Sequence, residues 1–189
     1  MSGMNRRQCL SLTAIGMAGI AGCTGSGVDN EPTSSEPTGS SESNRNGENF
    51  QERNDILNKY SDGIGEYNNG VDGRNQGSLS YNGGQYRQAL TAFEEAEKHY
   101  SNAREDFREC ISMSYNIDSG KATEIAEVAA EASLLNRDAV AAAQSAAEAG
   151  IDNNIDRANK KLDEFKELES EAEALNIRGT PAMQNTLDL

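Results

Sequence analysis

The spacing of apolar residues between Phe50 and Asn176 constrains the fold of this chain more than any other feature. Apolar residues recur there at alternating intervals of three and four, which places a stripe along one side of a helix. No proline lies between Pro37 and Pro181, so nothing in the stretch forbids long helices. Four runs show the pattern: Leu57, Tyr60, Ile64, Tyr67 and Val71; Tyr86, Ala89, Phe93, Ala96, Tyr100, Ala103, Phe107, Cys110 and Ser114; Ile125, Val128, Ala132, Leu135, Ala139, Ala142, Ala146 and Ala149; and Ile151, Ile155, Ala158, Leu162, Phe165, Leu168, Ala172 and Leu175.

Turn-forming and capping residues separate the four runs. Asn82-Gly83-Gly84 can reverse the chain, Asp118 and Ser119 can cap the third helix, and Gly150 with Asp152 can separate the third helix from the fourth. Links this short place consecutive helices antiparallel to each other. A mean spacing of about 3.5 residues favours shallow, left-handed crossing of the helices.

The sequence therefore predicts an all-α fold, an antiparallel up-down bundle of about four long helices over residues 50–176. A disordered tether is expected before it. The last residues, 177–189, form a C-terminal tail in this division. Gly179 and Pro181 predict that the tail leaves the bundle.

The first and third helices differ in intrinsic helix propensity. The third has 12 alanines between Ala122 and Ala149, which favour the helix and permit close approach of a neighbour. Glycine in a helix interior costs up to about 1 kcal/mol relative to alanine. We therefore expect the first helix to be kinked, frayed or ordered only by its partners, because it contains Gly63, Gly65, Gly70, Gly73 and Gly77.

The first 23 residues have the composition of an export signal. Arg6 and Arg7 precede an apolar run of 13 residues from Leu10 to Gly22, whereas a transmembrane helix needs about 20 apolar residues. Small residues follow, at the place where a processing enzyme grips extended backbone. The segment is therefore predicted to be a signal peptide and not a permanent span.

Two short motifs in this segment carry a family resemblance. Arg6-Arg7-Gln8-Cys9-Leu10 resembles the twin-arginine signal, although that signal favours phenylalanine where Cys9 stands. Ile20-Ala21-Gly22-Cys23 resembles the lipobox of prokaryotic lipoproteins. The resemblance implies removal of residues 1–22 and a diacylglyceryl or diether lipid on Cys23. This lipid would hold the chain to the cell membrane, facing outside the cytoplasm.

Residues 23–49 join the lipid site to the helical region. They are rich in Ser, Thr and Glu, and their only branched aliphatic side chain is Val28. So polar a stretch cannot bury enough surface to offset the entropy of ordering it. A flexible, disordered linker is therefore expected.

The charge of the chain bears on its partners. Removal of residues 1–22 leaves 15 basic and 31 acidic side chains, a formal charge of −16. Such an excess repels phosphate backbones, so nucleic acid is a poor partner. The acidic composition, absence of tryptophan and twin-arginine lipobox together resemble surface lipoproteins of halophilic archaea.

No combination of residues indicates catalysis, a metal or a cofactor. His99 is the only histidine, which leaves zinc and di-iron sites without ligands and favours a solvated position beside the second apolar stripe. Cys110 lies on that stripe, where a small thiol fills space. After loss of Cys9 and lipidation of Cys23 it would be the only free cysteine, so no internal disulfide is expected.

Tyr86, Phe93, Tyr100 and Phe107 repeat every seven residues and are the candidate interaction face. Core packing is their ordinary role. The alternative is a tyrosine-lined groove between the first two helices that accepts a partner helix or a ligand. Residues 75–96 also resemble part of a tetratricopeptide repeat, which packs a helical hairpin, but no second copy is visible.

These features favour a lipid-anchored cell-surface bundle that acts as a protein-interaction or structural module and not as an enzyme. We expect an extracytoplasmic protein partner, and an oligomer is compatible with the sequence. One alternative is a ligand-capturing accessory lipoprotein of a transporter, although solute-binding proteins generally need a cleft between two lobes. Another is an envelope hydrolase that uses surface carboxylates.

Overall fold

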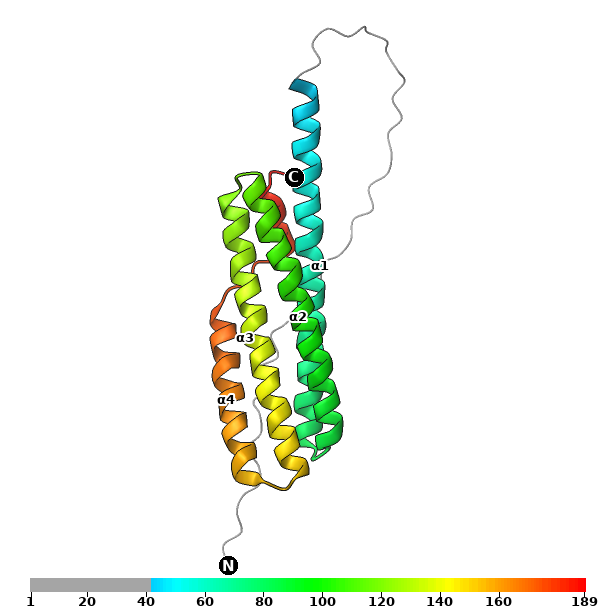
Figure 1. The fold of residues 1–189 in the computed structure, drawn as a ribbon, viewed down its shortest axis with the longest axis vertical. Coiled ribbons are helices and arrows are strands. Elements are labelled where there is room, and N and C mark those ends of the chain that lie inside the picture. Colours follow the sequence, from blue (N-terminus) through cyan, green and yellow to red (C-terminus); the bar gives the residue numbers. More distant parts are fainter. Residues whose placement is uncertain (1–41) are drawn as a thin grey trace, which may run out of the picture.

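The computed structural model describes residues 42–189, with side chains from residue 49 onward. Residues 42–189 contain no strand and form five helices: α1 Glu42–Asn82, α2 Tyr86–Asn116, α3 Gly120–Ile151, α4 Ile155–Ala174 and α5 Thr180–Thr186. Helices α1 to α4 run up and down beside one another in chain order (Figure 1). The predicted all-α antiparallel bundle is therefore confirmed, with all of its helices supplied by one chain.

Three turns of the same kind join the first four helices. Their middle residues have positive φ angles, 74° at Gly84, 58° at Asp118 and 58° at Asn153. In each turn the following amide donates to a carbonyl five positions earlier, a Schellman closure that satisfies the exposed end of a helix. These bonds are Gln85 N to Ser80 O at 2.9 Å, Ser119 N to Ser114 O at 3.0 Å, and Asn154 N to Ala149 O at 2.8 Å.

Helix α1 is longer and more regular than the sequence predicts. It begins at Glu42, within the stretch assigned to the linker, and continues without interruption to Asn82. Once a helix has formed, each added residue gains a backbone hydrogen bond, and no proline lies between Pro37 and Asn82 to stop it. Of the three expected alternatives, the kink and the fraying are wrong, whereas packing against a partner helix agrees with the third. The reason is tertiary packing of the glycines against α2, described below.

The boundary between α3 and α4 also differs from its prediction. Gly150 lies inside α3, which ends at Ile151, and the chain reverses through 152–154. Asn154 caps α4, because its side-chain oxygen accepts a hydrogen bond from the Arg157 amide at 3.1 Å. Ser119 occupies the capping position of α3 as expected, but its side chain makes no capping hydrogen bond.

The C-terminal tail does not leave the bundle. Helix α4 is short and packs along one half of α3, and the other half of the bundle is covered by α5 (Figure 1). Pro181 lies in the first turn of α5, where its missing amide proton costs nothing, so it starts a helix there. Met183 and Leu187, four residues apart, place apolar side chains in the core.

Backbone contacts fix the tail further. The Tyr60 hydroxyl donates to the Arg178 carbonyl, and Arg53 Nη1 donates to the Leu187 carbonyl at 3.1 Å. The core beside α5 combines Ile56, Tyr60, Phe107, Met183 and Leu187 with alanines of α2 and α3. The core beside α4 combines Phe93, Tyr100, Val140 and Phe165, again with alanines.

Candidate functional site

The aromatic residues of the candidate interaction face lie in the core. Phe93, Tyr100 and Phe107 are 2%, 0% and 0% exposed. They contact α1 at glycines that are also seven residues apart. A Cβ atom on Gly63 would lie 2.6 Å from Phe107 Cε1, one on Gly70 2.8 Å from Tyr100 Cδ1, and one on Gly77 2.5 Å from Phe93 Cδ1. We call these three pairs the glycine–aromatic ladder.

The ladder explains why the groove between α1 and α2 is closed. Real Cβ atoms do not approach other atoms to 2.5–2.8 Å, so only glycine allows the α1 backbone to lie directly on these rings. The structure therefore places Phe93, Tyr100 and Phe107 in the ordinary packing role, with α1 of the same chain occupying the expected docking position.

Tyr86, the fourth member of the face, remains half-buried at the end of the bundle. Its ring lies against Gly150 of α3, where a Cβ would be 2.8 Å from Tyr86 Cδ1. On the α1 side it makes an edge contact with Tyr81, with ring centroids 5.2 Å apart and planes at 64°. Tyr86 is thus the only one of the four that reaches the surface.

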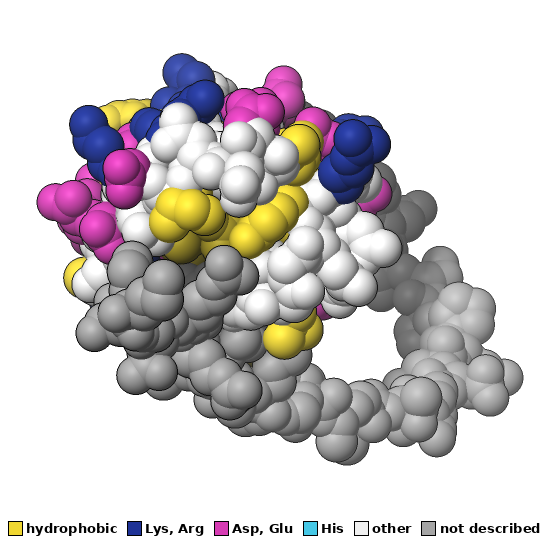
Figure 2. Space-filling model, turned by 90° about the horizontal axis from the view of Figure 1, so that it is seen from below, with side chains coloured by type: hydrophobic (Ala, Val, Ile, Leu, Met, Phe, Trp, Pro, Cys, Tyr) yellow, Lys and Arg dark blue, Asp and Glu magenta, His cyan; other side chains and the backbone are white. Residues whose placement is uncertain are grey.

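Tyr86 belongs to an end surface that carries exposed aliphatic side chains. This end holds the turns 83–85 and 152–154. We define the apolar tip as the exposed residues Leu79, Ile151 and Ile155 together with the half-buried Tyr81 and Tyr86. Looking onto this end, Figure 2 shows hydrophobic side chains gathered near the centre, with charged side chains toward the upper and lateral edges of the view.

The exposure of these residues differs from the sequence pattern. Ile151 and Ile155 were assigned to the buried stripe of the fourth helix, but they are 40% and 53% exposed. They flank the α3–α4 turn, so they lie past the last packed layer of the bundle. Leu79, at a packing position of the tetratricopeptide-like segment, is 55% exposed. The helical hairpin is present there, and the resemblance is interpreted as convergence on hairpin packing.

A polar layer crosses the interior beside the ladder. Arg74 of α1 is only 14% exposed, and its Nη1 contacts Glu169 Oε1 of α4 at 3.0 Å and Asn136 Oδ1 of α3 at 3.1 Å. Asn136 Nδ2 in turn donates to the Tyr67 hydroxyl at 3.0 Å. Within residues 42–189 the backbones of α1 and α4 do not come into contact, so the Arg74 side chain bridges them.

Burial is the main cause of the pKa shifts in this polar layer. It raises the pKa of Glu169, although the Arg74 guanidinium acts in the opposite direction. It also raises the pKa of Tyr67 and, further, that of Tyr100. The Tyr100 hydroxyl is buried and has no hydrogen-bond partner among the described residues. Sequence reasoning missed this layer, although Arg74 falls seven residues after Tyr67 and seven before Tyr81.

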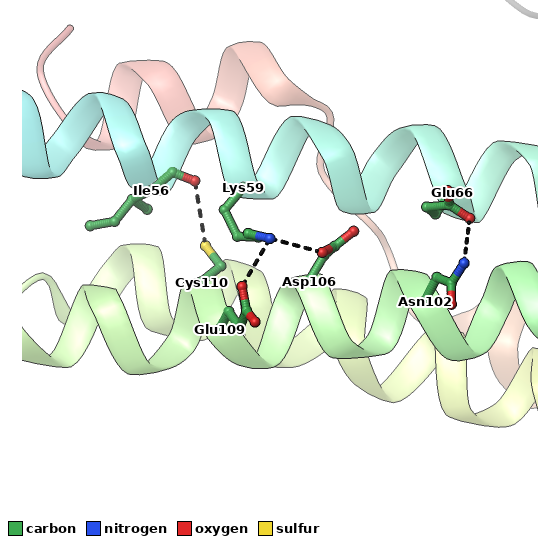
Figure 3. A network of polar contacts seen from close by, with 7 residues as sticks. All are labelled: Ile56, Lys59, Glu66, Asn102, Asp106, Glu109 and Cys110. Atoms are coloured by element: carbon green, nitrogen blue, oxygen red, sulfur yellow. Dashed lines mark hydrogen bonds and ion pairs between the residues drawn. The ribbon is translucent and has the colours of Figure 1, made fainter.

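The remaining candidate residues are Cys110 and His99, and Figure 3 shows Cys110 between α1 and α2 together with Glu66, the partner of His99. Cys110 is a free, buried thiol whose Sγ lies 3.8 Å from the Ile56 carbonyl. Desolvation raises its pKa to about 11, so it stays protonated at neutral pH and fills space as expected. His99 Nδ1 lies 2.8 Å from Glu66 Oε2, a carboxylate that Asn102 also contacts. The His99 side chain is 36% exposed, as a flanking residue would be.

Arg6, Arg7 and Cys23 lie outside the described residues. Among residues 49–189, no three or more His, Cys, Asp or Glu side chains are grouped so that they could hold a metal ion. None of the described helices has the length and apolarity needed to cross a membrane. Comparison with protein-family models, curated proteins and solved structures finds no match for this chain.

Proposed function

We propose that this chain is a lipid-anchored, extracytoplasmic bundle that presents its apolar tip to a protein partner. The anchor is the lipid on Cys23 that the lipobox resemblance implies, added after export through the signal containing Arg6 and Arg7. The observation that carries the proposal is the placement of the tip at the end of the bundle opposite the start of α1 (Figure 1).

This placement gives the tip a direction relative to a membrane. The chain from Cys23 enters the described structure at Glu42, the far end of α1 from the tip. Helix α1 has 41 residues and is therefore about 60 Å long at 1.5 Å per residue. An anchor at Cys23 leaves the tip as the end that can project farthest from the lipid surface.

The chemistry of the tip fits a protein partner. Leu79, Ile151 and Ile155 expose aliphatic surface, and Tyr81 and Tyr86 add aromatic edges with hydroxyl groups. Apolar and aromatic side chains surrounded by charged ones are typical of the centre of a protein interface. The partner is therefore expected to offer a complementary apolar surface.

The anchor and the tip can be tested separately. Cys23→Ser should release the protein from the membrane fraction, and mass spectrometry of the wild-type protein should find a lipidated Cys23 as the first residue. For the tip, we would crosslink intact cells that express the full chain and identify stoichiometric neighbours. The triple variant Leu79→Ser, Ile151→Ser and Ile155→Ser should lose the neighbour that the wild type retains.

A matched control is available at the opposite end of the bundle. Phe50 and Tyr115 are 60% and 67% exposed, so the double variant Phe50→Ser and Tyr115→Ser removes comparable apolar surface there. It should keep the neighbour, and circular dichroism should show both variants folded. Equal loss in both variants, or a neighbour retained by the folded tip variant, would refute tip docking.

A further inference from the structure

A groove between α2 and α3 gathers arginine side chains on this strongly acidic protein. It has a volume of about 540 Å³ and is lined by Arg104, Arg108 and Arg137 together with Ser101, Ser112, Glu105 and Glu109. All but Arg137 come from α2, in the half of that helix away from the apolar tip. Sites for small ligands commonly have volumes of about 300–1,000 Å³.

Two of these arginines lack an acidic partner. Among the described side chains, neither Arg104 nor Arg108 forms an ion pair, whereas Arg137 is held by the adjacent Asp138 at 2.7 Å. Arg104 and Arg108 are four residues apart, so they lie on the same face of α2 and repel each other. Acidic side chains outnumber basic ones 31 to 17 in the full sequence, yet none of the acidic side chains described in residues 49–189 pairs with Arg104 or Arg108.

The carboxylates of the groove only partly compensate for these charges. Glu109 Oε2 is bound to Lys59 Nζ at 2.9 Å, and Asp106 Oδ1 shares the same lysine at 3.1 Å, so the charge of Glu109 is partly paired. Glu105 remains, and it is exposed. Guanidinium groups offer several N–H donors in a plane, which suits a carboxylate or a phosphate better than a single point charge does.

We propose that this groove binds a small oxyanion ligand, with Arg104 and Arg108 as its principal contacts and Arg137 at its α3 side. The ligand carries carboxylate, phosphate or sulfate groups that bridge the two arginines and relieve their repulsion. Ser101 and Ser112 lie at the two ends of the α2 lining. The Ser101 hydroxyl donates to the Glu97 carbonyl at 2.8 Å and can only accept from a protonated ligand group, so Ser112 is the hydroxyl that offers a further donor. This site is separate from the apolar tip and does not depend on a protein partner.

Titration calorimetry on the purified full chain tests the proposal, with citrate, inorganic phosphate and inorganic sulfate as separate probes. At least one probe should bind saturably, and the double variant Arg104→Gln and Arg108→Gln should weaken its binding about tenfold or more, because both principal charge-assisted contacts are removed. The preferred probe tells a planar carboxylate ligand from a tetrahedral one.

Two further variants separate binding at the groove from general attraction to the protein. Arg87→Gln with Lys98→Gln removes two positive charges from α2 outside the groove and should leave affinity within about twofold. Glu105→Gln removes the remaining free carboxylate and should tighten binding. Absence of saturable binding of all three probes, or equal weakening by the two double variants, would overturn the proposal.

Discussion

The glycine–aromatic ladder makes a prediction that is opposite to intrinsic helix propensity. Replacement of a glycine by alanine in a helix interior ordinarily stabilises the helix by about 1 kcal/mol. Gly65 should behave in this way, because a Cβ there would have no atom within 4 Å. Gly65→Ala is therefore the matched control for the same substitution at Gly70, because it lies in the same helix, five residues earlier, on the exposed face.

Gly70→Ala should not gain the stability that alanine ordinarily gives a helix, and it should be destabilised by a steric clash as well. Its Cβ would lie 2.8 Å from Cδ1 and Cε1 of Tyr100, whose side chain is fully buried. Normal contact between carbon atoms needs about 3.5–4.0 Å, so the ring or the α1 backbone must shift by close to 1 Å. Overpacking of this kind costs about 1–3 kcal/mol. Gly70→Ala should therefore be less stable than Gly65→Ala by about that amount.

Urea denaturation followed by circular dichroism at a fixed salt concentration measures both variants. Because the substitution and the helix are the same, the difference between the two midpoints reports the steric cost at the ladder. A second test pairs Gly77→Ala with Phe93→Leu, which removes the ring that the new methyl group would meet at 2.5 Å. The double variant should be more stable than the sum of the two single effects predicts, because the new methyl group no longer meets the ring. Equal stabilisation by Gly65→Ala and Gly70→Ala would refute the ladder.

Three other predictions follow from single contacts. Tyr100→Phe should leave stability unchanged or raise it by about 1 kcal/mol in thermal denaturation, because the buried hydroxyl has no protein partner whose loss would matter; a clear loss of stability would contradict this. Met183→Ala should destabilise the bundle by about 2–5 kcal/mol in the same assay, since the side chain is fully buried, and a surface-like effect would show that α5 does not pack. The hydrogen bond from His99 lowers the pKa of Glu66, so its contribution is present at neutral pH and is lost as the pH falls through that lowered value. Glu66→Gln should reduce the loss of unfolding free energy on acidification by less than about 1 kcal/mol, because the Glu66–His99 pair is partly exposed. Denaturation at a series of pH values measures this difference.

The sequence was sufficient to predict the number, type and direction of the long helices. Their apolar stripes are periodic, and the turns at Gly84 and Asp118 fall where the stripes break. The C-terminal residues were harder. Pro181 ends a helix when it lies in its interior and starts one when it lies in the first turn, and the sequence around it does not separate these cases. Because α4 is short, part of the bundle surface beside it is left uncovered, and α5 packs there. The length of uncovered surface depends on how the helices pack, which the sequence around Pro181 does not show.

Glycines show why part of the site could not be predicted from one helix alone. Gly65 and Gly70 have the same intrinsic propensity, yet one faces solvent and the other faces Tyr100. Only the register between α1 and α2 distinguishes them, and that register is visible in sequence when the spacing of Gly63, Gly70 and Gly77 is set against the spacing of the aromatic residues. In α1 a glycine recurs every seven residues, and in α2 an aromatic ring recurs at the same interval. Each glycine lies opposite a ring, so the two helices pack more closely than either could against a helix whose side chains are all of similar size.

The same reasoning explains why the apolar tip was assigned to the core. Ile151 and Ile155 continue the spacing of the fourth stripe, and Gly150 suggested that the turn came before them. Gly150 instead stays helical and packs against the Tyr86 ring, which leaves no room for a Cβ atom at this position. Helix α3 therefore extends to Ile151, and the turn falls between the two isoleucines. Periodicity therefore identifies which residues share a helix face, whereas the position of the last packed layer decides which of them are covered. An aliphatic residue beyond that layer stays in contact with water unless another molecule covers it, and this is the physical basis for our proposal that a partner binds at the tip.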